Sequence, residues 1–118
     1  MKKVSKKAID LCDRAVDTII STDIEGLKNL NCNFVARECG TSASYLTRIF
    51  KEVKGISLRT FIKYEKLSRF ILLHIEKRDI TTREAAEILG FDDVDYFIRS
   101  FKDHFGTTPK RYLNFFKK

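Results

Sequence analysis

With 118 residues, the chain has room for one domain or for two small lobes that share a helix. Hydrophobic residues make up 43% and charged residues 33%, with 5 Gly and 1 Pro, which excludes a disordered tail and favours a helical, folded protein. The net charge is +7, and residues 41–118 alone carry net +6, an excess that suits a polyanion, either nucleic acid or an anionic membrane.

The first half of the chain predicts one amphipathic helix and then two short helices around a tight turn. The predicted elements are a helix over 5–20, a loop over 21–30, a helix over 32–39 that Asn31 caps, and a helix from its cap Ser42 to about Val53. Gly40 and Gly55 are the residues expected to end the two short helices.

The second half predicts a long helix and three shorter ones. The elements are a helix over 58–77 that Ser57 caps, a helix over 82–89 begun by a Thr81–Glu84 capping box, a helix from its cap Asp92 to about His104, and a last helix to about Phe116 begun by Thr108 and Pro109. The prediction is an all-α fold of about seven helices without a strand.

An internal repeat organises these helices. Residues 45–55 read YLTRIFKEVKG and residues 96–106 read YFIRSFKDHFG, a displacement of 51, and upstream Ala36 matches Ala86 and Gly40 matches Gly90. The repeated unit, helix, Gly-containing turn and helix, is typical of a helix-turn-helix, in which a small residue on the first helix lets the second approach closely. The predicted segments are 1–56 with the first such unit, 57–77 as a linker helix, and 78–118 with the second unit and a last helix.

In each repeated second helix, one face is apolar and the opposite face is polar. The opposite face holds Ser44, Thr47, Arg48 and Lys51 in the first copy, and Asp95, Ile98, Arg99 and Lys102 in the second. These side chains are candidates for contact with DNA. A linker helix of about 20 residues is about 30 Å long, close to the separation of about 34 Å between successive major grooves.

Three stretches carry a resemblance to a known family: SASYLTRIFKEVKG from Ser42, EAAEILGF over 84–91, and YFIRSFKDHFGTTPKRYL from Tyr96. They resemble the DNA-binding domain of the AraC/XylS family of bacterial transcription regulators, over about residues 30–113. The resemblance implies two recognition helices in adjacent major grooves of one double-stranded site. Three departures, Lys66 and Phe70 for a usual Arg and Ala and Thr82 for a bulky aliphatic residue, predict local repacking.

The resemblance also implies a role for each matching residue. The implied base contacts are Ser44, Thr47 and Arg48 in the first groove and Asp95 and Arg99 in the second, and the implied phosphate contacts are Lys51, Lys102, Thr108 and Lys110.

The charges of the two units differ, which leaves the second unit open to other interpretations. Residues 42–59 carry net +3, whereas residues 92–111 carry four basic and four acidic residues. Asp95 suits a helix N-terminus and an ion pair with Arg99 as well as it suits a cytosine N4. The alternative function is therefore a helical protein-interaction module in which the second unit is the docking surface.

Other functional classes lack their signals. Cys12, Cys32 and Cys39 lack C-x-x-C spacing, which predicts buried thiols in a reducing compartment rather than a metal site. Without a Gly-rich phosphate loop or a nucleophile and base pair, we expect no enzyme and no cofactor. Without a signal peptide or membrane-spanning run, we expect a cytoplasmic protein. The expected partner is double-stranded DNA, bound by a monomer unless the chain is part of a longer one, with RNA polymerase as a second candidate.

Overall fold

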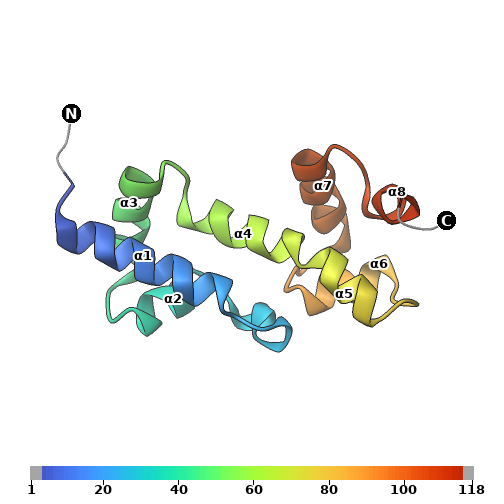
Figure 1. Ribbon diagram of the computed structural model, residues 1–118, viewed down its shortest axis with the longest axis horizontal. Helices are drawn as coiled ribbons and strands as arrows, with labels where there is room; N and C mark the ends of the chain where they lie inside the picture. The colour runs from blue at the N-terminus through green and yellow to red at the C-terminus, as the bar shows by residue number, and fades with distance from the viewer. Residues whose placement is uncertain (1–3, 116–118) are drawn as a thin grey trace. The chain divides into compact units, whose positions relative to one another are not determined.

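The computed structural model describes residues 4–115. All regular structure in this part of the chain is helical (Figure 1), which confirms the predicted all-α class. The elements are α1 (Lys6–Ile20), the 3-10 helix η1 (Ile24–Asn29), α2 (Cys32–Glu38), α3 (Ala43–Lys54), α4 (Leu58–Ser68), α5 (Phe70–Glu76), α6 (Thr82–Ile88), α7 (Val94–Phe105) and α8 (Pro109–Asn114). The predicted end of the last helix, Phe116, lies outside the described residues.

Helix caps explain why most elements begin where the sequence predicted. The cap side chains of Ser5, Asn31, Ser42, Ser57, Thr81 and Thr108 each accept a hydrogen bond from the backbone N–H three residues later. The predicted capping box is also present, because Thr81 N–H donates to Glu84 Oε1 at 3.1 Å. The predicted cap Asp92 is wrong: Asp93 has the extended backbone of a cap, and its Oδ1 accepts from Asp95 N–H at 2.9 Å.

The described residues form two compact units. Unit 1 comprises residues 4–23 and 29–65, and unit 2 comprises Ile24–Lys28 and residues 66–115. The boundary falls inside α4, so the predicted linker contributes residues to both units. The short segment Ile24–Lys28 joins unit 2 although the residues on either side of it belong to unit 1.

In unit 1, α1 contacts both α2 and α3 (Figure 1, blue to green), and the first part of α4 also belongs to this unit. Ile19 of α1 and Leu46 and Phe50 of α3 are fully buried. The Phe50 ring meets the Phe61 ring edge to face, with 5.6 Å between centroids. This apolar core orients α3, while the opposite face of that helix is left to solvent.

Unit 2 is built around a cluster of phenylalanines. The Phe70 ring lies 5.1 Å from Phe101 and 5.7 Å from Phe97, and the Phe91 ring lies 5.1 Å from Phe97. All four side chains are buried. Phe70 thus packs against two rings of α7, and the local repacking expected at this position stays a prediction.

The single long helix predicted over 58–77 is wrong, because α4 ends at Ser68 and α5 begins at Phe70. Between them, Arg69 N–H donates to Lys66 O at 3.2 Å, three residues back, which is the tighter pattern of a 3-10 turn. The chain here has neither Gly nor Pro, so no local signal marks the break. The described residues therefore contain eight α-helices where about seven were expected.

The loop predicted over 21–30 is also partly wrong, since η1 forms within it. Leu27, at its centre, is completely buried. A 3-10 turn needs no sustained apolar period, which is why the pattern did not indicate it.

Candidate nucleic-acid interface

Each unit contains one helix-turn-helix, α2 with α3 in unit 1 and α6 with α7 in unit 2. The first helices carry Ala36 and Ala86, both 2% exposed, at the positions where a small residue is expected to let the second helix approach closely. The two turns close alike: Thr41 N–H donates to Ala36 O at 3.0 Å, and Phe91 N–H donates to Ala86 O at 2.8 Å. The repeat in the sequence is therefore a repeat in structure.

The turns need glycine because each passes through the left-handed region. Gly40 has φ +72° and Gly90 has φ +91°. This backbone reverses the chain between the two helices of each unit and sets the direction in which α3 and α7 leave the turn.

Helix α3 gathers the four predicted DNA-contacting residues of the first unit on one exposed face. Leu46, Ile49 and Phe50 are at most 4% exposed on the opposite side. The exposed side chains are those of Ser44, Thr47, Arg48 and Lys51. A helix with this division presents hydrogen-bond donors and positive charge along one stripe, as the major groove requires.

One neighbour of Arg48 was not predicted. The Arg48 guanidinium lies over the Tyr45 ring, 5.3 Å from its centroid, and Tyr45 is 39% exposed. The two residues are three positions apart and so share a helix face, a spacing that could have indicated the contact. The ring restricts the orientations of the guanidinium before any ligand is present.

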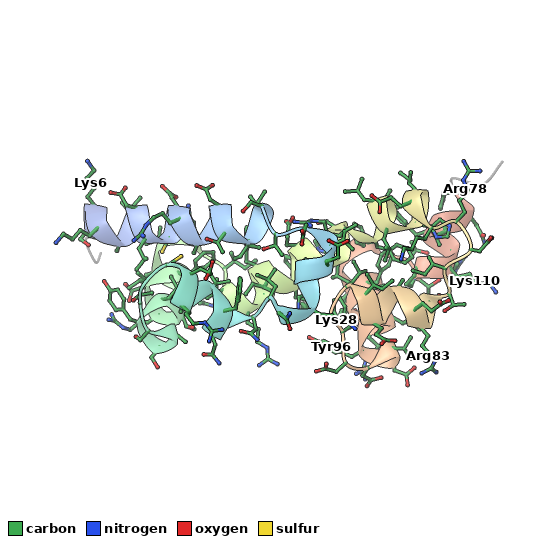
Figure 2. The ribbon with its side chains drawn as sticks, turned by 90° about the horizontal axis from the view of Figure 1, so that it is seen from below. Lys6, Lys28, Arg78, Arg83, Tyr96 and Lys110 are labelled. Atoms are coloured by element: carbon green, nitrogen blue, oxygen red, sulfur yellow. The ribbon has the colours of Figure 1, made fainter. Side chains whose placement is uncertain are left out.

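Helix α7 presents a matching stripe of different composition. Phe97 and Phe101 are fully buried, and Asp95, Arg99 and Lys102 are exposed. Within the described chain no ion pair joins Asp95 to Arg99, so the local pair considered from the sequence is not formed. Tyr96, the counterpart of Tyr45, packs against Phe91 at 6.1 Å and remains 40% exposed (Figure 2).

The start of α8 carries the last two predicted contacts. The Thr108 hydroxyl caps the helix by accepting from Arg111 N–H at 3.3 Å, and this side chain is partly buried. Lys110 extends from the surface (Figure 2). Of the pair, Lys110 is the freer to meet a phosphate.

The cysteines lie in unit 1, and all three are free thiols. Cys12 and Cys39 are buried as expected, whereas Cys32 is partly exposed. Burial raises the pKa of Cys12 and of Cys32, opposed by the charges of Lys54 and Arg59 respectively. Residues 4–115 hold no cluster of three His, Cys, Asp or Glu suited to a metal ion, and none of their helices combines the length and apolarity needed to cross a membrane.

The chain is similar in sequence to a known family and to several known proteins. Residues 35–114 match the family described as "Helix-turn-helix domain". The probable transcription factor PqrA from Proteus vulgaris is 28% identical over 93 residues, which cover 79% of this chain and 75% of PqrA. The F1 operon positive regulatory protein from Yersinia pestis is 33% identical over 90 residues, covering 72% of this chain but only 30% of that protein.

Solved structures agree with this relationship. The C-terminal domain of AraT, a response regulator from Geobacillus stearothermophilus, superposes with a TM-score of 0.71 at 25% identity, covering 94% of this chain and 86% of that one. The DNA-binding domain of AdpA, solved in complex with a target DNA, gives a TM-score of 0.61 at 16% identity, covering 92% and 90%, and shares the fold. The chain belongs to the helix-turn-helix domain family of AraC/XylS-type transcription regulators.

Proposed function

We propose that this chain regulates transcription by binding one double-stranded DNA site with α3 and α7 as two recognition helices in adjacent major grooves. The observation that carries the proposal is the repeated helix-turn-helix whose second helix is apolar on the buried face and polar on the exposed face. Family membership and the regulatory names of the relatives support the same function. We also propose that the protein is cytoplasmic and that it acts without a catalytic step or a cofactor.

In unit 1, Arg48 is the principal base-reading residue of the proposal. Its fork of donors pairs bidentately with guanine O6 and N7, and the Tyr45 ring limits its motion beforehand. Ser44 and Thr47 lie on the same exposed face, and their short side chains supply hydroxyl groups for base contacts. Lys51, one turn further along α3, holds a phosphate and thereby sets the register.

In unit 2, we assign base contacts to Asp95 and Arg99 and phosphate contacts to Lys102, Thr108 and Lys110. The even balance of charge over residues 92–111 makes this unit the weaker binder, because carboxylates near phosphates repel them. Both recognition helices are on one chain, so a monomer suffices for one asymmetric site. RNA polymerase remains a predicted second partner.

Selection of bound sequences from a pool of random duplex DNA tests this function. The expected result is a preferred site with two short conserved blocks about one helical turn apart. Binding should also weaken steeply as salt rises, because phosphate contacts release counterions. Binding that ignores both sequence and salt would instead favour the protein-interaction alternative.

A control variant with the same change of charge separates base reading from general electrostatic attraction to DNA. Arg48→Ala should relax the preference at one base position, whereas Arg78→Ala removes the same charge from the exposed loop between α5 and α6 (Figure 2) and should leave the preferred sequence unchanged. Equal weakening by Arg48→Ala on all sequences would remove Arg48 from the base-reading set.

A further inference from the structure

The turns of the two helix-turn-helix units differ in what surrounds them. A Cβ atom placed on Gly40 would meet no atom within 4 Å beyond those of its own residue and its two chain neighbours. A Cβ atom placed on Gly90 would lie 2.7 Å from the Leu27 carbonyl oxygen and 3.0 Å from Lys66 Nζ. The glycine of the second turn is therefore covered closely by other parts of unit 2, whereas the glycine of the first turn is open.

The segment that covers Gly90 comes from far upstream in the sequence. Ile24–Lys28 lies between α1 and α2 but belongs to unit 2. Leu27 is completely buried there. Lys28, labelled in Figure 2, places its Nζ 3.8 Å from Glu87 Oε1 of α6. The Lys28 pair is exposed and contributes little, so the buried Leu27 side chain is the main anchor of the segment.

Lys66 joins the same cluster from α4. Its Nζ donates to the Gly90 carbonyl oxygen at 3.4 Å. Burial lowers the pKa of Lys66, and the charge of Asp92 opposes this effect. A partly buried ammonium that donates to a turn carbonyl resists movement of that turn, because withdrawing it leaves a buried polar group without its partner.

We propose that Ile24–Lys28 and Lys66 form a clamp on the turn between α6 and α7, and that Leu27 and Lys66 are positioning residues for the second recognition helix. Only Phe91, Asp92 and Asp93 separate Gly90 from the start of α7, so movement of the turn changes where Asp95 and Arg99 point. The role in reading DNA rests on the function proposed for α7. The clamp segment lies outside residues 35–114, the part that matches the family.

Amide hydrogen exchange of the whole chain tests the clamp without DNA. Leu27→Ala empties a fully buried site in unit 2. We expect the amides of α7 to exchange about 30-fold faster or more, and those of α3 to change by less than about threefold. Equal acceleration in both helices, or none in α7, would overturn the proposal.

Two milder comparisons keep the test decisive if Leu27→Ala does not fold. Lys66→Met removes the donor and should accelerate exchange from Gly90 to Asp95, whereas Lys66→Arg should restore protection. Gly90→Ala and Gly40→Ala both place a Cβ atom on a left-handed backbone, with φ +91° and +72°, but only the first also meets the Leu27 carbonyl. Gly90→Ala must therefore perturb its unit more than Gly40→Ala does; similar effects would contradict the clamp.

Binding to a duplex selected by the unchanged chain tests the positioning role. Lys66→Met should reduce discrimination against a scrambled second half of the site by about tenfold, as expected when one base contact is misplaced, while discrimination in the first half is kept. Loss in both halves would rule out a role confined to α7. If the unchanged chain selects no sequence, the proposed function fails, and the exchange results still decide whether the clamp exists.

Discussion

Replacement of Tyr45 by Leu gives the sharpest test of how the first unit reads DNA. Tyr45 and Arg48 are both on the exposed face of α3, and the guanidinium lies 5.3 Å from the ring centroid. An exposed cation–π contact contributes about 0.5–1 kcal/mol, which corresponds to about a 2- to 5-fold change in affinity. Loss of a bidentate base contact in Arg48→Ala costs about 1–3 kcal/mol, or about 5- to 150-fold.

The expected order of affinity for the selected duplex follows from these magnitudes. Tyr45→Phe keeps the ring and should bind within about twofold of the unchanged chain, Tyr45→Leu should bind more weakly, and Arg48→Ala most weakly. Fluorescence anisotropy titrations at one fixed salt concentration measure all three. In the double variant, the Tyr45→Leu change should have no further effect, because its partner is gone.

Two results would refute this reasoning. If Tyr45→Leu binds more tightly, the stacked guanidinium is held away from its base and must be released before reading. If Tyr45→Leu costs the same with and without Arg48, Tyr45 acts on the duplex directly rather than through the guanidinium.

Three further predictions concern the fold and its charges. Lys54 Nζ lies 2.6 Å from Asp13 Oδ1 in a partly exposed ion pair. Asp13→Asn should therefore lower the free energy of unfolding by no more than about 1 kcal/mol. This difference should disappear in high salt, which screens the pair. Hydrogen bonds from the backbone N–H and the side chain of Thr81 lower the pKa of Glu84. The ionised Glu84 therefore stabilises the folded chain fully above the ordinary Glu pKa of about 4.3, and this stabilisation is lost as pH falls through the lowered pKa. Glu84→Gln should flatten the decrease of the melting temperature at acid pH in a series of thermal melts. The buried Cys12 thiol, whose pKa burial raises, should react with a maleimide at neutral pH only after unfolding, and rapid labelling of the native chain would contradict its position in the core.

The sequence predicted those parts of the molecule that depend on neighbours along the chain. Asn31, Ser42 and Thr108 act as caps over three residues, so their identity and spacing suffice. The repeat likewise located both recognition helices and the polar faces they expose. Gly40 and Gly90 were predicted as turn residues for the same local reason.

The features that escaped prediction depend on contacts between distant residues. Leu27 is buried and its backbone carbonyl lies against Gly90, yet nothing within residues 24–28 indicates this neighbour. The interruption at Arg69 accompanies the burial of Phe70 among rings from α7, again without a local breaker. The charge count predicted that the second unit binds DNA more weakly. It gave no reason to expect that this unit depends on the upstream segment Ile24–Lys28.

The contrast between the open turn at Gly40 and the covered turn at Gly90 bears on the engineering of new specificities. A replacement for the first helix-turn-helix has free space at Gly40, and it has to match α1 at the buried Cys39, whose Sγ lies 4.0 Å from Thr18 Oγ1. The second one would have to be transplanted together with its upstream segment and the lysine of α4. Chimaeras of this chain should therefore accept foreign first halves more readily than foreign second halves.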